Sequence, residues 1–390
     1  MNNTNYIFFA LLRSAIKNQP LTSQEKELFN IGLLPEIYKL SCNHDLVHLV
    51  SMAIEKNQLL DKENEFLNKF RVRQLKAIFR YEKLNYELNH LCNAFEKENI
   101  PYMLLKGSVI RNLYPEPWMR TSCDIDVLVH REDFAKTKKL LVERYGYTPY
   151  SETTHDEGFL APNGSHIELH YTLIEEDEAN YSSKILKKIW DNAVLEQGSH
   201  CKYQMTDEVF FFYHIAHMAK HIKNGGCGVR PFLDLWFLEK EKSLISHQSV
   251  IQMLESAKML QFAKTAIKLS ANWFEGAAGD DATTILQKFV LTGGVYGIFE
   301  NRFVLQQHDK SRKLTYLLSR IFVSKMHLEK IYPSCKIRNW LIPFYQVRRW
   351  VGLCSKCRRK RIVNELKTYS NIPEQQFFDA KKMLNDLGLD

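Results

Sequence analysis

Two aspartates separated by one residue lie in an apolar stretch of the chain, residues 123–129. Successive side chains of a β-strand alternate between its two faces, so Asp124 and Asp126 would share one face. Ile125 and Val127 would then point into the core. Mg²⁺ takes hard oxygen ligands and commonly binds through one or two carboxylates plus substrate phosphates, so this pair suits a divalent cation. The alternative is an edge strand with a solvated polar face.

A basic residue, a glycine and a serine precede this pair, in the sequence Lys106-Gly107-Ser108. They follow a predicted strand at residues 102–105 and lead into a predicted helix at residues 109–113. Glycine lets the backbone approach a ligand, and the Ser108 hydroxyl with the first free amides of a helix would bind an anion. Most Gly-Ser pairs are ordinary turns, so this signal depends on the carboxylates that follow.

A third carboxylate lies downstream in His166-Ile167-Glu168-Leu169-His170, where polar and apolar residues alternate. The alternation places Glu168 on one face of a strand together with both histidines. A two-metal phosphoryl-transfer site needs such a ligand, because one carboxylate must serve the metal that activates the attacking oxygen. The three segments together therefore predict phosphoryl transfer.

A small mixed α/β domain at residues 99–204 would position these side chains. Strands are predicted at 102–105 and 125–129, and a surface helix at 131–145 ends at Gly146. Residues 158–160 and 165–171 flank the turn Ala161-Pro162-Asn163-Gly164, which predicts a hairpin.

Helices are predicted on both sides of this domain, which gives an α+β fold class. In the N-terminal helical region, residues 1–98, one apolar helical face is formed by Leu84, Leu88, Leu91 and Phe95. The C-terminal helical domain, residues 205–390, begins with Thr206 followed by acidic residues, a helix N-terminal signal. It ends in a basic tail.

The order of these motifs resembles that of the DNA polymerase beta-like nucleotidyltransferase superfamily. The matching residues are Lys106-Gly107-Ser108, Arg120, Asp124-Ile125-Asp126 and Glu168-Leu169-His170. More closely, the chain resembles a bacterial family of uncharacterised nucleotidyltransferases often found near surface-polysaccharide genes. That likeness continues through residues 217–221, Gly225-Gly226, Arg230, Asp234 and residues 293–297, and covers residues 20 to 350.

The resemblance implies a polymerase beta-like fold for the catalytic domain and an Mg²⁺- or Mn²⁺-dependent transfer. A nucleoside monophosphate would pass from a nucleoside triphosphate, with ATP the first candidate, to a hydroxyl of a small molecule, sugar or polymer, releasing pyrophosphate. Asp124, Asp126 and Glu168 would bind the metals, and Glu168 would help to deprotonate the acceptor. The residues implied to contact the nucleotide are Lys106, Gly107, Ser108, Arg120, His217, Lys220 and Arg230.

Two departures from the superfamily pattern leave open an inactive, binding-only site. The third carboxylate is Glu168 where Asp is more usual, and fifteen residues separate Ser108 from Asp124, a long spacing. Arg120 would balance phosphate charge or be an exposed loop arginine. The alternatives to a transferase with a hydroxyl acceptor are a nucleotide-binding module in surface-polysaccharide assembly and a toxin-like transferase acting on RNA or protein.

His214, His217 and His221 recur at helical spacing with Lys220 beside them. They would bind zinc, contact phosphate or substrate through Lys220 and His217, or form a structural polar face. No glutamate follows His217 as the metalloprotease motif requires. Arg230 would be brought near by the intervening glycine-rich turn.

The composition is that of a globular protein. The 390 residues are 45% hydrophobic and 25% charged, which argues against disordered, collagenous and membrane-spanning classes. The eight cysteines are scattered, which indicates reducing, cytoplasmic surroundings. Cys354 and Cys357 have no second pair downstream, which favours incidental thiols over a zinc ribbon.

The net charge of +8 is unevenly distributed. Residues 310–367 contain sixteen Lys and Arg against two acidic residues, a net +14 that leaves −6 on the rest of the chain. Residues 340–361 are basic, aromatic and amphipathic, as in an interfacial helix on an anionic membrane. The favoured interpretation is that these aromatic residues pack into the helical domain and leave the arginines exposed. The alternative is a cytoplasmic protein that is peripheral at the inner membrane face, and nucleic acid is the least favoured partner.

Overall fold

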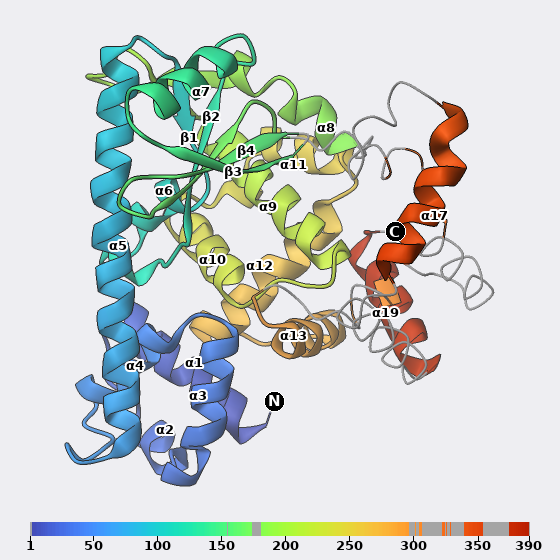
Figure 1. The fold of residues 1–390 in the computed structure, drawn as a ribbon. Helices are drawn as coiled ribbons and strands as arrows, with labels where there is room; N and C mark the ends of the chain where they lie inside the picture. The colour runs from blue at the N-terminus through green and yellow to red at the C-terminus, as the bar shows by residue number, and fades with distance from the viewer. Residues whose placement is uncertain are drawn as a thin grey trace.

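The structure is a computed structural model that describes residues 2–153, 155–173, 181–295, 339–353 and 374–389, with isolated positions between 301 and 328. It confirms the α+β class, because helices from both ends of the chain flank a mixed sheet of seven strands (Figure 1). Of the tail motifs, Cys354, Cys357 and residues 358–361 lie outside the described residues, as do residues 296 and 297.

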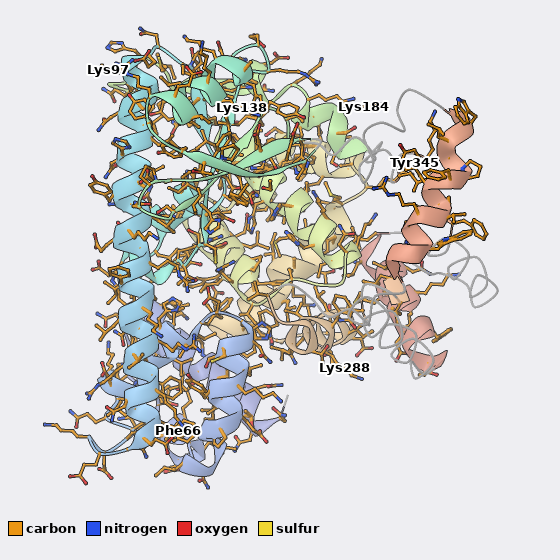
Figure 2. The ribbon with its side chains drawn as sticks, viewed as in Figure 1. Phe66, Lys97, Lys138, Lys184, Lys288 and Tyr345 are labelled. Carbon is orange, nitrogen blue, oxygen red and sulfur yellow. The ribbon has the colours of Figure 1, made fainter. Side chains whose placement is uncertain are left out.

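The N-terminal helices are α1 (Asn3–Ile16), α2 (Ser23–Leu28), α3 (Leu34–Asn43), α4 (Val47–Lys56) and α5 (Glu65–Lys97). Helix α5 is much the longest of them, and it runs along one side of the molecule from these helices to the sheet (Figure 1). Phe66 and Lys97 mark its two ends in Figure 2. The predicted apolar face is confirmed, because Leu84, Leu88, Leu91 and Phe95 are all buried.

The strands are β1 (Tyr102–Leu104), β2 (Asp124–Val129), β3 (Thr148–Glu152), β4 (Asp156–Leu160), β5 (His166–His170), β6 (Ala193–Leu195) and β7 (Lys202–Met205). Their order in the sheet is β3-β4-β5-β2-β1-β7-β6. Strands β4 and β5 form the predicted antiparallel hairpin. Strand β2 pairs antiparallel with β1 and parallel with β5. The strand that carries the aspartates is therefore central, not an edge strand.

The two faces of the sheet have different surroundings. Ile125 and Val127 pack into one hydrophobic cluster with α5 and with Leu141 of α7 (Phe134–Glu143). The predicted surface helix at 131–145 is shorter in the structure: α7 ends at Glu143 with Arg144 as its C-cap, and Gly146, with φ +70°, lies in the turn that follows. Leu128 points the other way and belongs to the larger cluster formed with the N- and C-terminal helices. Asp124 and Asp126 therefore lie on the face of the sheet that packs on this larger cluster, and not on the face that packs on α5 and α7.

The C-terminal helices are α8 (Tyr181–Leu186), α9 (Asp207–Lys223), α10 (Arg230–Lys242), α11 (Gln248–Ser256), α12 (Leu260–Glu275), α13 (Asp281–Gly293), α17 (Ile342–Leu353) and α19 (Glu374–Leu387). The Thr206 side chain caps α9 by accepting from the Val209 amide, as predicted. Among the described residues no helix is both long and apolar enough to cross a membrane.

The helices before and after the sheet share one hydrophobic core. Phe9 of α1 stacks on Trp273 of α12, with ring centroids 4.6 Å apart. Arg13 also donates a hydrogen bond of 3.0 Å to the Trp273 carbonyl. The division at residues 98 and 204 stays a prediction, but the terminal regions pack together around the sheet.

Candidate active site

Neighbouring strands bring two of the three predicted carboxylates, Asp126 and Glu168, close together, whereas Asp124 is not in the group of possible ligand atoms found among the described residues. In the parallel register of β2 and β5, Asp126 lies opposite Glu168, and Asp124 lies opposite His166. Ile125 and Val127 are fully buried on the other face, which confirms the predicted alternation. Asp126, Glu168 and His170 offer possible ligand atoms that all lie within 4.8 Å of one another. Their roles as metal ligands stay predictions.

Asp126 is buried between two hydrogen-bond donors, Lys106 and His170. Its Oδ1 atom accepts hydrogen bonds from Lys106 Nζ at 2.9 Å and from His170 Nε2 at 3.0 Å. Burial alone would raise the pKa of Asp126, but Lys106 and His170 outweigh it and hold the pKa well below its usual range. Asp126 is therefore a fixed negative charge at the centre of the site.

Among the described residues, no hydrogen bond or ion pair holds the Asp124 carboxyl. Burial, followed by the charges of Asp126 and Glu168, raises the pKa of the Asp124 carboxyl to about 6. A divalent cation between these carboxylates would remove that repulsion, and their oxygen donors are the ligands that Mg²⁺ and Mn²⁺ prefer. The donor set thus fits the metal that the resemblance implies.

The loop from Lys106 to Ser108 lies next to the carboxylates, because Lys106 bonds to Asp126. Lys106 has φ +42°, and Gly107 opens the short helix α6 (Gly107–Ile110). A Cβ atom at Gly107 would come within 2.8 Å of an Arg120 guanidinium nitrogen, so a larger residue would have to displace the guanidinium that Asp234 and Thr121 hold. The Ser108 hydroxyl is buried and has no hydrogen-bond partner among the residues that the structure describes. It is a donor available to a ligand oxygen, as a phosphate would supply.

Arg120 is occupied within the protein and not exposed. Its guanidinium binds Asp234 of α10 through both carboxylate oxygens, at 3.2 and 2.9 Å, and donates to the Thr121 carbonyl at 2.9 Å. Only 10% of the Arg120 side chain is exposed, so the alternative of a loop arginine in solvent is wrong. The Tyr114 hydroxyl donates to the same aspartate at 2.7 Å. The Arg120 guanidinium therefore lies against Gly107. Its proposed contact with a phosphate stays a prediction.

Helix α9 brings His217 to the site, whereas α10 brings Arg230 to its edge. Burial and then the charge of Lys106 lower the pKa of His217 well below its ordinary value, so this imidazole is neutral at pH 7. Arg230 donates to the Thr121 carbonyl at 3.0 Å and contacts Asp45 at 3.3 Å. Lys220 is half-buried on the same helix as His217.

The zinc alternative for the α9 histidines gains no support. Nε2 of His217 and Nε2 of His221 lie 3.2 Å apart, and His214 Nε2 contacts the Pro231 carbonyl at 2.9 Å. In the described part of the chain, the possible metal-ligand groups involve other residues. His214 thus has a structural contact, and only His217 lies next to the candidate site.

Sequence reasoning assigned no role to several residues that support the site. His170 had a detectable signal, because it follows Glu168 by two positions and shares its strand face. Arg111 donates to the Gly107 carbonyl at 2.9 Å and to the Ser122 hydroxyl at 3.0 Å, four residues from the glycine it holds. Asp45 contacts Arg230 from far away in the chain, and no local pattern could have indicated it.

The chain was compared with known proteins. The model of a family described as "Uncharacterised nucleotidyltransferase" matches residues 34–275, from the start of α3 to the end of α12. No curated protein matches the chain. Among solved structures, a Thermotoga maritima CCA-adding enzyme complexed with tRNA is similar at 12% identity, over 78% of this chain and 82% of that one. The TM-score is 0.20, which supports no inference about residues or substrate.

Proposed function

Because the chain belongs to this family of uncharacterised nucleotidyltransferases, we propose that it moves a nucleoside monophosphate from a nucleoside triphosphate to a hydroxyl acceptor. ATP is the first candidate for the donor, and pyrophosphate is the second product. The acceptor is a small molecule, a sugar or a polymer.

The observation that carries the proposal is the pairing of Asp126 with Glu168 across β2 and β5, with Asp124 on the same face. Asp124 has a raised pKa because it is buried and because its neighbours Asp126 and Glu168 are negative, which is the arrangement that a divalent cation would stabilise. Bound Mg²⁺ or Mn²⁺ would polarise the phosphates and activate the acceptor hydroxyl.

The side chains of this protein have distinct proposed tasks. Lys106 and His170 keep Asp126 ionised and fix the orientation of its carboxylate. The Glu168 side chain is 34% exposed, so an acceptor hydroxyl can reach it and give up its proton there. The unpartnered Ser108 hydroxyl would donate to a phosphate oxygen of the nucleotide. His217, Lys220, Arg120 and Arg230 remain proposed contacts to the nucleotide.

We expect ATP with Mg²⁺ or Mn²⁺ to raise the melting temperature by a few degrees, since a ligand at 100 times its Kd stabilises by about 2.7 kcal/mol. The shift should vanish without metal and shrink in Glu168→Gln. Glu143→Gln, which changes an exposed glutamate of α7, is the matched control. Absence of any shift in the wild type at saturating nucleotide would count against the proposal.

Transfer itself is followed with ATP labelled at the α-phosphate, incubated with fractionated cell extract. Label on small molecules or sugars supports the proposed acceptor class. Label on RNA or protein would favour the toxin-like alternative. Metal-dependent binding with no label transfer and no pyrophosphate release would favour the nucleotide-binding module.

We also propose that α17 places the protein at an anionic membrane surface, on the cytoplasmic side. Trp340, Phe344 and Val347 recur at spacings of four and three and are 73%, 61% and 51% exposed. Helix α17 lies at the margin of the molecule, where Tyr345 is labelled in Figure 2. Arg348 and Arg349 follow on the same helix, and a basic residue near an anionic surface contributes about 1 kcal/mol. This helix lies beyond the residues that the family model matches.

The full chain should therefore co-sediment with phosphatidylglycerol vesicles, and this binding should weaken as the salt concentration rises. The double variant Trp340→Ser/Phe344→Ser should lose most of this binding, whereas Phe378→Ser, a 65% exposed aromatic of α19, should retain it. Equal binding to neutral phosphatidylcholine vesicles, or full binding by the double variant, would contradict the membrane role.

A further inference from the structure

A second group of possible metal ligands lies at the other end of the β4–β5 pair from the hairpin turn. Asp156 opens strand β4 directly after His155, and His170 closes strand β5. Asp156 and His170 are direct partners in the antiparallel register, so their side chains leave the same face of the sheet. This group contains two imidazoles and one carboxylate, unlike the oxygen ligands proposed for the nucleotide metal.

The distances among these atoms are close to those of ligands around one ion. Asp156 Oδ2 lies 2.9 Å from His155 Nε2 and 3.8 Å from His170 Nδ1. All three ligand atoms lie within 4.8 Å of one another. Ligands at Zn–N and Zn–O distances of about 2.0–2.1 Å in tetrahedral geometry are roughly 3.3 Å apart. Small side-chain shifts would therefore bring the three atoms to a common centre.

The His170 ring points independently to a missing ligand. His170 is only 4% exposed, and its Nδ1 atom is buried without a hydrogen-bond partner. Its other nitrogen, Nε2, is bonded to Asp126 Oδ1 at 3.0 Å. A buried nitrogen left without a partner is costly, and Asp156 Oδ2, at 3.8 Å, is too far for a hydrogen bond.

The His155 ring is also held so that one nitrogen is directed at the group. Its Nδ1 atom lies 3.1 Å from the Thr153 hydroxyl, which leaves Nε2 directed at Asp156. Metal-binding histidines are commonly fixed in this way, with a polar partner on the nitrogen opposite the ion. His170 is fixed in the same way. Its Nε2 atom is bonded to Asp126, so its Nδ1 atom is the nitrogen that could bind an ion together with His155 and Asp156.

We propose that His155, Asp156 and His170 bind Zn²⁺ or a similar borderline transition ion, at a site separate from the nucleotide metals. Two imidazoles and a carboxylate are a known zinc donor set, with a fourth position left for water. Mg²⁺ prefers oxygen ligands and is a poor competitor for nitrogen. The site goes beyond the proposed transferase activity and does not depend on it.

His170 would connect this site to the candidate active site. An ion on Nδ1 fixes the proton of His170 on Nε2, where it donates to Asp126. The imidazole then keeps the Asp126 carboxylate in one orientation without adding a full positive charge of its own. The ion would therefore act on Asp126 through His170, and His155 is a positioning residue in this scheme.

Zinc binding to the full-length protein is measured after chelator treatment, by competition with a fluorescent zinc indicator in excess Mg²⁺. We expect one bound Zn²⁺ that Mg²⁺ does not displace, and a rise in melting temperature with Zn²⁺ alone. His155→Ala and Asp156→Asn should each weaken zinc binding by at least about tenfold, which is the smallest loss of metal affinity usually seen when a residue that supports a metal site is changed. His200→Ala, which removes an exposed histidine elsewhere, should bind as the wild type does.

Glu168→Gln separates this site from the candidate active site, because Glu168 belongs only to the group with Asp126. Retention of Zn²⁺ in Glu168→Gln together with loss in His155→Ala supports the proposal. Unchanged affinity in both His155→Ala and Asp156→Asn overturns it, as does loss of Zn²⁺ in Glu168→Gln or on adding Mg²⁺. Failure of nucleotide transfer would leave this zinc result unaffected, so the two proposals fail separately.

Discussion

Asp126→Asn is expected to lower the rate of nucleotide transfer by roughly a thousandfold, the largest effect of any single substitution at the site. Asp126 is the buried carboxylate that faces Glu168 across the sheet and is held ionised by Lys106 and His170. An amide removes the charge that would bind the cation and leaves Lys106 without its partner. A loss of about 4 kcal/mol in transition-state stabilisation corresponds to this thousandfold effect.

The measurement is label transfer from ATP in the acceptor fraction identified above, with the metal-dependent melting shift as a second readout. Asp191→Asn is the matched control, because it makes the same chemical change at an exposed position outside the site. Far-UV circular dichroism checks that the variant is folded. A folded Asp126→Asn protein with wild-type transfer would remove Asp126 from the mechanism.

The local part of this site was predictable from sequence because strand alternation is a local rule. A period of two residues places Asp124 and Asp126 together, and the same rule groups Glu168 with His170. The turn at residues 161–164 predicted the β4–β5 hairpin, which the structure confirms. The parallel pairing of β2 with β5 then joins these local groups, and it is consistent with both apolar faces packing on α5.

The remaining strands were missed for a physical reason. Strand β3 is exposed along its whole length and contains Pro149, so neither burial alternation nor β propensity identifies it. It is an edge strand, where a proline is tolerated. Strand β6, at the other edge, has three residues, and β7 pairs with β1 from a distant part of the chain. Edge strands depend on the sheet that they join more than on their own sequence.

The contacts that hold the site together were not predictable, because they join residues distant in sequence. Lys106 bonds to Asp126, twenty residues later in the chain, and Arg120 bonds to Asp234 in a helix that follows the whole sheet. Arg230 meets Asp45 from the opposite end of the fold. Such pairs depend on tertiary packing, which no spacing rule describes. The sequence thus indicated the chemistry of the site, whereas the buried ion pairs that fix its geometry required the structure.

The ion pair between Arg120 and Asp234 is expected to give the largest stability effect. Asp234→Asn leaves the Arg120 guanidinium buried without a counter-charge, and breaking a buried pair in this way costs about 3–5 kcal/mol. Burial opposes ionisation of Asp234, but Arg120 outweighs it and keeps the pKa of the carboxyl below its ordinary value. Equilibrium unfolding in urea should therefore show a much lower midpoint. Lys268→Met, which removes a solvent-exposed ion pair with Asp280, should change the midpoint little.

A double variant separates stability from positioning. Arg120→Met/Asp234→Leu removes both charges, and replacing a buried pair by apolar side chains is often close to neutral for stability. The double variant should recover much of the stability lost in Asp234→Asn, yet it removes the guanidinium that lies against Gly107. The nucleotide affinity of the double variant should nevertheless be lower than that of the wild type, because the loop carrying Lys106 and Ser108 no longer packs against the guanidinium. Wild-type affinity in a stable double variant would show that the pair serves folding alone and leaves the phosphate loop to position itself.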